Sequence, residues 1–159
     1  ERRLVSGFYA VFSVSLLLTA MEEVAWGQWF FGFETPSLLK ERNIQVEFTF
    51  HNLRGLQGHS EFFRVTFGLG GLVGVLLFFH EYFRKIGVPI ILLPYFLIIT
   101  VLSGMDLYND YFPIQRDIDV GLQRLSELVE MLIGVSGFLF VWLNARMLVA
   151  EWKEKVSRY

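Results

Sequence analysis

Long apolar runs constrain the fold of this sequence more than any other feature. Residues 4–21 carry no charge, and three further apolar runs lie at about 62–79, 88–105 and 122–143. A helix of roughly 20 residues crosses the hydrocarbon core of a bilayer. The mean hydropathy of +0.45, with 53% hydrophobic residues, exceeds what a soluble chain of 159 residues can bury. We therefore predict an all-α polytopic membrane protein.

The predicted architecture is a single domain built as a bundle of four transmembrane helices. Their expected bounds are about 4–33, 62–80, 88–107 and 121–146. Pro94 lies inside the third helix and predicts a kink, because proline leaves a carbonyl without its donor. In the second helix, Gly70 and Gly74 are spaced for close packing against a neighbouring helix.

The connection at residues 34–61 is the most distinctive loop. Thr35 and Pro36 are typical of a helix start, so we expect a short interfacial helix from Pro36 to Arg42. Residues 44–51 then alternate between apolar and polar side chains, which predicts an extended segment laid over the bundle. Its polar side would carry Glu47 and His51.

Lysine and arginine in the short flanking segments set the orientation. Arg84 and Lys85 share a tight turn, and the C-terminal tail is basic as well. We expect both termini in the cytoplasm and loops 34–61 and 107–120 outside.

This topology predicts a group of carboxylates at the outer ends of the helices. They are Glu22, Glu23, Asp106, Glu127 and Glu130. An ionised carboxylate in hydrocarbon is costly unless it is paired, protonated or bound to a cation. Glu127 and Glu130 share one helical face. They could hold a divalent metal ion, share a proton, or pair with arginines such as Arg124.

Two sets of candidate residues follow. The metal-ligand candidates are Glu22, Glu23, Asp106, Glu127, Glu130 and His51. The candidates for catalysis are Glu127, Glu130 and His51. No His-x-x-x-His or Glu-x-x-His pair fixes a metal on one helix, so the metal reading depends on convergence in space.

Composition excludes several function classes. The net charge of −2 provides no basic field for nucleic acid. With no cysteine there is no thiolate nucleophile and no cysteine-ligated zinc or iron–sulfur site. The glycines of residues 68–74 lie within an apolar run, which is typical of helix packing and not of a phosphate loop.

Several short strings carry a resemblance to a known family. They are Glu-Glu-Val-Ala-Trp-Gly-Gln at 22–28, Glu-Thr-Pro at 34–36, Asn-Ile-Gln-Val-Glu at 43–47 and His-Asn-Leu at 51–53. Together they resemble the signature of an uncharacterised family of polytopic bacterial membrane proteins. The resemblance implies a membrane bundle and, as its location, a bacterial cytoplasmic (inner) membrane; it implies no substrate. The residues expected to support the site are Trp26, Gln28, Glu34, Glu47 and Asn52. Trp29 departs from the pattern, where a basic residue is expected.

Three functions remain open. The favoured one is a non-catalytic accessory subunit of a larger membrane complex, in contact with lipids, other subunits or copies of itself, and with lipid or pigment packed on its aromatic helices. The second is a metal-dependent membrane hydrolase that uses Glu23, Glu130 and His51 to activate a water. The third is a cation- or proton-coupled transporter. Carboxylates each paired with Arg54, Arg64, Arg116 or Arg124 would oppose the enzyme interpretation.

Overall fold

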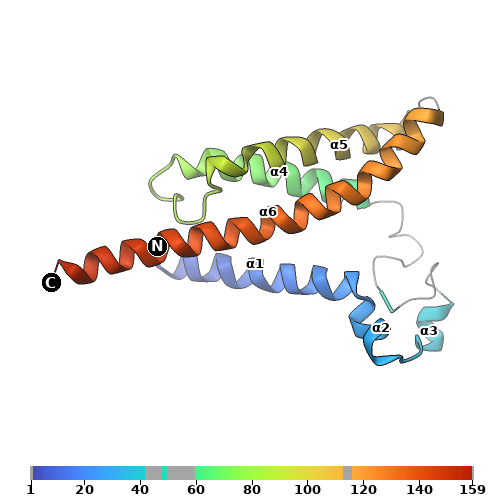
Figure 1. Ribbon diagram of the computed structural model, residues 1–159, viewed down its shortest axis with the longest axis horizontal. Helices are drawn as coiled ribbons and strands as arrows, with labels where there is room; N and C mark the ends of the chain where they lie inside the picture. Colours follow the sequence, from blue (N-terminus) through green and yellow to red (C-terminus); the bar gives the residue numbers. More distant parts are fainter. Residues whose placement is uncertain (1, 42–47, 50–59, 113–115, 159) are drawn as a thin grey trace. The chain divides into compact units, whose positions relative to one another are not determined.

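The computed structural model describes residues 2–41, 48–49, 60–112 and 116–158 (Figure 1). Within these residues it is helical and holds no strand. Four helices are long and apolar enough to cross a membrane, over Arg3–Glu22, Glu61–Phe78, Ile90–Asn109 and Arg124–Ser157. The predicted all-α membrane fold with four spans is confirmed.

The chain forms two compact units, which are described separately. The N-terminal unit, Arg2–Ser60, contains α1 (Arg2–Glu23), η1 (Ala25–Gly27), α2 (Gln28–Phe31) and α3 (Ser37–Lys40). The C-terminal unit, Glu61–Tyr159, contains nearly all of α4 (Ser60–Phe78), then η2 (Ile90–Leu92), α5 (Leu93–Tyr111) and α6 (Arg116–Ser157).

A break in the N-terminal unit overturns the prediction of one helix from 4 to 33. Three consecutive residues have left-handed backbone, with φ of 46° at Ala25, 53° at Trp26 and 82° at Gly27. A right-handed helix cannot pass through such residues, so α1 ends at Glu23 and α2 begins at Gln28. Hydropathy alone does not reveal this reversal, because the apolar run continues through it.

The short loop helix also differs from its predicted bounds. It spans Ser37–Lys40, and Pro36 takes the N-cap position that we expected for Thr35. Thr35 is instead buried in the unit. Most of the predicted extended segment, residues 44–51, lies outside the described residues; of it, only Phe48 and Thr49 are described.

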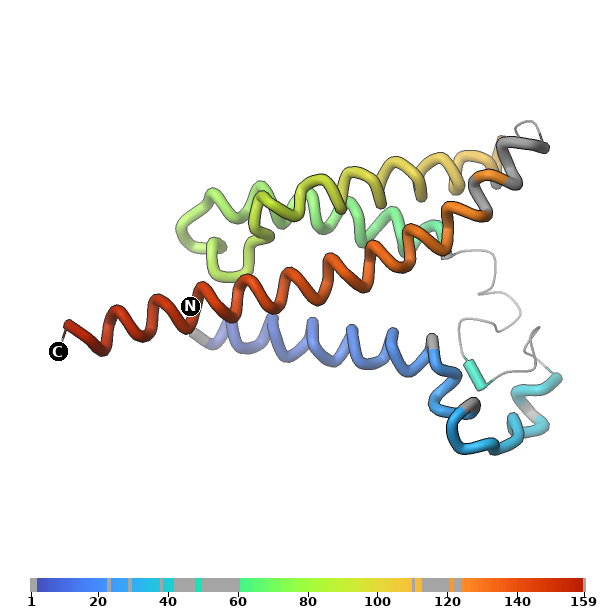
Figure 2. Tube along the Cα trace, in the orientation of Figure 1, coloured from blue at the N-terminus to red at the C-terminus, as the bar shows by residue number. Residues whose placement is uncertain are grey.

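In the C-terminal unit, α4 runs beside α5 (Figure 2), and glycines of α4 face α5. A Cβ added at Gly68 would meet the Thr100 hydroxyl at 2.4 Å, and one at Gly71 would meet the Phe96 ring at 1.9 Å. A Cβ added at Gly74 would lie 2.5 Å from Cγ2 of Val88, in the connection that precedes α5. Gly70 is exposed and meets nothing within 4 Å, so this face differs from the predicted Gly70 and Gly74 pair.

Pro94 introduces no kink inside a helix, contrary to prediction. It is the second residue of α5, which follows a short 3-10 turn. At that position the missing N–H would have had no helical partner, so proline does not destabilise the helix.

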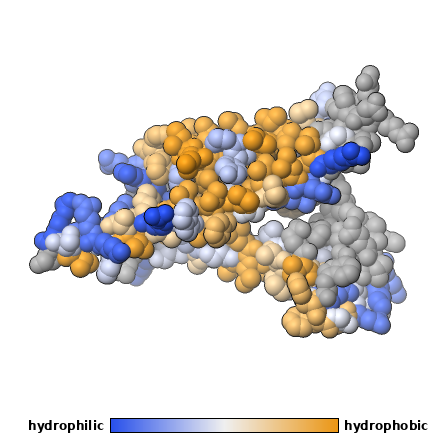
Figure 3. Space-filling model, viewed as in Figure 1, coloured by the Kyte–Doolittle hydropathy of each residue, from blue (hydrophilic) through white to orange (hydrophobic). Residues whose placement is uncertain are grey.

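Helices α5 and α6 pack along each other and enclose the core of the C-terminal unit. Ile99 of α5 and Val129 of α6 are almost fully buried, as is Ser136. The 42 residues of α6 extend beyond the predicted 121–146. At about 1.5 Å per residue this helix reaches roughly 63 Å, about twice the thickness of the hydrocarbon core. Its C-terminal part is polar, whereas the outer surface of the unit is largely apolar (Figure 3).

Candidate functional site

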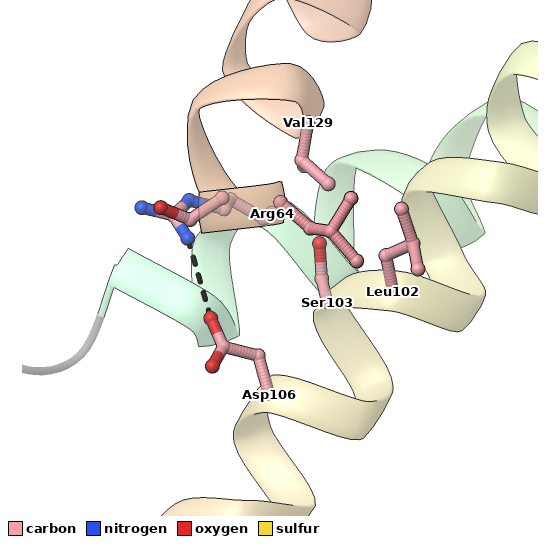
Figure 4. Close-up of a pocket in the computed structure, with 7 residues that line it drawn as sticks. Arg64, Leu102, Ser103, Asp106 and Val129 are labelled. Atoms are coloured by element: carbon pink, nitrogen blue, oxygen red, sulfur yellow. Dashed lines mark ion pairs between the residues drawn. The ribbon is translucent and has the colours of Figure 1, made fainter. Parts of the chain in front are cut away.

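Arg64 is the centre of an ion-pair cluster that joins three helices of the C-terminal unit. From the first turns of α4, its guanidinium reaches Glu130 of α6, with Nη2 2.7 Å from Oε1. Its Nη1 lies 3.5 Å from Oδ2 of Asp106 on α5, as drawn in Figure 4. Glu61, one turn earlier on α4, lies 4.0 Å away. We call these four residues the Arg64 cluster.

The surroundings of the Arg64 cluster strengthen these ion pairs. The Arg64 side chain is only 12% exposed and that of Asp106 16%, whereas the Glu130 side chain is 48% exposed. Partial burial lowers the effective dielectric constant, so the attraction exceeds that of a surface pair. One cation faces three carboxylates, and the guanidinium is the donor that suits this arrangement, because its five N–H groups are held in a rigid fork.

The depth of the Arg64 cluster in a membrane can be inferred from the uncharged stretches between the cluster and the other end of the unit. Residues 65–79 of α4 and its C-terminal flank carry no charge, and neither do residues 131–145 of α6. Each stretch is roughly 22 Å long at about 1.5 Å per residue, less than the ~30 Å hydrocarbon core. If both ends meet the bilayer edges, the Arg64 cluster lies at the boundary of the apolar layer, where an unpaired charge is costly.

A small recess lies beneath the guanidinium. It is lined by Arg64, Leu102, Ser103, Asp106, Leu125, Ser126 and Val129 (Figure 4). Ser103 is 1% exposed, and its hydroxyl has no hydrogen-bond partner among the described residues. With leucine and valine on the opposite wall, the recess joins the ion pairs to the apolar core of the unit.

The structure brings together two of the predicted carboxylates, and no ion pair joins a third, Glu127, to them among the described residues. Asp106 and Glu130 meet at Arg64. Glu127 and Arg124 are both exposed, and no ion pair joins them in the described part of the chain. The central residue, Arg64, was not among the predicted site residues. Its signal in the sequence is a single cation at the start of an otherwise apolar run.

A second polar group surrounds the helix break of the N-terminal unit. The Trp26 indole donates a hydrogen bond to the Glu22 carboxylate. The Gln28 side chain bridges two segments: its Nε2 donates to Thr35 Oγ1 at 3.0 Å, and its Oε1 accepts from the Phe48 backbone N–H at 2.8 Å. The residues of the Trp-Gly-Gln string thus hold the turn and the following loop in place.

The remaining candidates fall partly outside the described residues. Glu34 is exposed and pairs with Lys40 at 2.9 Å. This contact lowers the pKa of Glu34, through the hydrogen bond first and the charge of Lys40 second. Nothing is described of Glu47, His51 and Asn52, or of the Glu23 side chain.

The structure also bears on the predicted metal site. Among the residues that it describes, no three histidine, aspartate or glutamate side chains are placed to hold a metal ion together. Because His51 and the Glu23 side chain are not described, the full predicted ligand set stays a prediction.

Comparisons with known proteins give no further identification. No family model matches the chain, and neither does any curated protein or solved structure. The resemblance to the family of polytopic bacterial membrane proteins therefore stays a prediction that rests on the strings at 22–53.

Proposed function

We propose that this chain is a non-catalytic subunit of a larger membrane complex. The observation that carries the proposal is the engagement of Asp106 and Glu130 by Arg64. These carboxylates come from two helices and the guanidinium from a third, so the cluster ties the C-terminal unit together.

The chemistry of these pairs favours a structural role over catalysis. A carboxylate that binds a metal or removes a proton must offer a lone pair to the ligand. Here the guanidinium donates a hydrogen bond to Glu130 Oε1 and lies 3.5 Å from Asp106 Oδ2, and its positive charge repels a cation from the same place. The Glu22 carboxylate is likewise an acceptor, for the Trp26 indole. Acids held in this way position helices for assembly.

The surface of the C-terminal unit supports packing against other helices. An open groove on α5 is lined by Thr100, Val101, Gly104, Met105 and Tyr108. A Cβ at Gly104 would meet nothing within 4 Å, so a neighbouring helix can approach the backbone closely there. We assign this groove to a helix of a partner subunit.

The proposal includes a location. We place the chain in a bacterial cytoplasmic membrane with both termini in the cytoplasm. The basic residues support this orientation, because Arg84, Lys85 and Arg146 belong to the opposite end of the C-terminal unit from the Arg64 cluster.

Native electrophoresis of the chain from its own membranes tests the proposal. A tagged chain, extracted in mild detergent, is expected to migrate in a complex several times its mass of 18.5 kDa and to bring other chains with it. Gly104→Leu fills the α5 groove and should shift the chain to the monomer position. A homogeneous monomer from wild-type membranes would refute the proposal, and an assembly of this chain alone would replace it with a homo-oligomer.

Gly134→Leu is the matched control. Gly134 of α6 is exposed, and a Cβ there also meets nothing within 4 Å. The two variants add the same volume to open helix surfaces, so both should fold alike. Loss of the complex in both would show a general effect of added bulk and not a specific contact at the groove.

A further inference from the structure

The C-terminal part of α6 continues past the uncharged stretch as a regular helix. Residues 131–145 carry no charge, whereas six of the 13 residues from Arg146 to Arg158 are charged. The helix is unbroken as far as Ser157, and no proline or glycine follows residue 137 (Figure 2). At about 1.5 Å per residue this part is roughly 20 Å long. Because it continues a membrane-spanning helix without a bend, it leads away from the apolar layer and into water.

Exposed apolar side chains recur along one side of this charged part. We call them the tail stripe: Ala145, Val149, Trp152 and Val156. The last three are each more than half exposed. Successive members are four, three and four residues apart, which is the spacing of the a and d positions of a coiled coil. Lipid does not reach this part of α6, so its apolar side chains indicate a contact surface for another protein.

The same heptad pattern runs back through the membrane-spanning part of α6. Its members there are Leu128, Met131, Val135, Phe138 and Trp142, all of them exposed. Spacings of three and four residues therefore alternate without interruption from residue 128 to residue 156. A partner helix that follows the tail stripe meets one continuous face of α6 inside and outside the membrane.

The positions beside the tail stripe are mostly basic. In the heptad register set by Val149 and Trp152, the flanking e and g positions hold Arg146, Leu148, Lys153 and Lys155. The three basic side chains are exposed. Glu151 and Glu154 lie outside the flanking positions, toward the other side of the helix. Charges at e and g positions select the partner of a coiled coil, so this face fits a helix that carries carboxylates there.

A second copy of this chain fits the surface poorly. Copies with the same membrane orientation would pair in parallel, and each layer of a symmetric parallel pair places identical residues together. Trp142 would meet Trp142 and Trp152 would meet Trp152, which overpacks both layers. The flanking positions would offer each other only basic or apolar side chains, with no carboxylate to compensate them.

We propose that the tail stripe binds an α-helix of a partner subunit whose own apolar heptad is flanked by aspartate or glutamate. The inference rests on the proposed function and specifies the chemistry of the partner. Carboxylates of the partner helix pair with Lys153 and Lys155, and small side chains opposite Trp152 leave room for its ring. The partner helix runs beside α6 on the cytoplasmic side of the membrane.

Site-specific photocrosslinking of the tagged chain in its own membranes tests this contact. A benzophenone amino acid replaces Trp152 or, as the matched control, Glu154, which is also exposed but lies away from the tail stripe. Illumination should join position 152 to one other kind of chain. The crosslinked peptide should belong to a segment with apolar residues at heptad spacing and acidic residues beside them. Position 154 should give no such product.

Two charge reversals test the selection by charge. Lys153→Glu should lower the yield of the crosslink from position 152 about fivefold, because a flanking attraction becomes a repulsion. Arg158→Glu makes the same change of charge on the side of the helix away from the tail stripe, and it should leave the yield unchanged. Equal effects of the two variants would exclude Lys153 as a selecting residue and overturn the proposal.

The identity of the product decides the remaining outcomes. Crosslinks from position 152 to lipid, to a second copy of this chain or to a segment without acidic residues would overturn the inference, and so would equal yields from positions 152 and 154. Native electrophoresis of the same membranes separates this failure from that of the proposed function. An intact complex without the specific crosslink refutes the inference alone, whereas a monomer refutes the subunit function and the inference with it.

Discussion

Arg64 shows how a single side chain can join three helices of a membrane protein. Its side chain extends from α4 to acids on α5 and α6 and pairs with both. Removing one partner of a partly buried ion pair costs more than the pair contributes, because the remaining charges lose their compensation. In the absence of Arg64, Glu130 would lose the hydrogen bond from the guanidinium, and Asp106 and Glu61 would lose their ion pairs with it.

Arg64→Gln tests this role. We expect it to lower the free energy of unfolding by about 2–3 kcal/mol, below the range for a fully buried pair because Glu130 is half exposed. Thermal unfolding in detergent, followed by circular dichroism, measures the loss. Arg158→Gln is the control, since Arg158 pairs with Glu154 on an exposed surface and should cost less than about 0.5 kcal/mol. Equal losses would rule out a special role for Arg64.

The ion pair between Glu34 and Lys40 predicts that the stability of the loop in the N-terminal unit depends on pH. Lys40 holds its pKa below the ordinary value of 4.5, so the folded state favours the ionised carboxylate. The stabilisation is therefore complete above the pKa of the unfolded chain, and it is lost as the pH falls through the lower, folded value. Lys40→Gln should move the titration midpoint of Glu34 upward, toward 4.5.

Carboxyl ¹³C chemical shifts of the labelled chain report this midpoint directly. Because the pair is exposed, added salt should shift the wild-type midpoint in the same direction. A midpoint that does not respond to Lys40→Gln would exclude the ion pair as its cause.

At the scale of the helices, the glycine face of α4 determines how closely α5 approaches. Gly71→Ala places a methyl group 1.9 Å from an atom of the Phe96 ring, so the helices must separate or the ring must move. We expect a loss of about 1–3 kcal/mol, as in other overpacked cores. Gly70→Ala adds the same methyl group on the exposed side and should be neutral or stabilise α4 by up to about 1 kcal/mol.

Melting temperatures of the two glycine variants in one detergent provide the measurement. The comparison removes the effect of helix propensity, because both substitutions exchange glycine for alanine in α4. A lower melting temperature for Gly70→Ala than for Gly71→Ala would contradict the packing that the structure shows.

At the scale of the whole molecule, the two ends of the C-terminal unit differ in charge, and this difference predicts its orientation. The chain has no cysteine, so a single introduced thiol reports its own position. In intact cells, a membrane-impermeant maleimide should label Glu127→Cys, and Glu81→Cys only after the membrane is permeabilised. Glu81 and Glu127 are both exposed, so access to the side chain itself is matched. The reverse pattern would invert the proposed topology.

Some features of this protein follow from its sequence alone. Apolar runs of about 20 residues fix the number of spans and the helical class, since the bilayer requires every backbone group to be bonded within its segment. The presence of acids near the ends of these runs was equally plain. Which of the four candidate arginines pairs with them was not, because Arg64 lies 66 residues from Glu130, and only the packing of α4 against α6 joins them.

Other features depended on the tertiary structure. Spacing alone permits Gly70 and Gly74 to form the packing face. In the structure, Gly68 and Gly71 make room for the Thr100 and Phe96 side chains, and Gly74 makes room for Val88. The helix break at Ala25 is likewise hidden within an apolar run, because hydropathy reports burial and not the sign of φ. Sequence thus determined which segments enter the membrane. The rotation of each helix, and the contacts made by its few polar residues, were decided by side-chain packing between segments far apart in the chain.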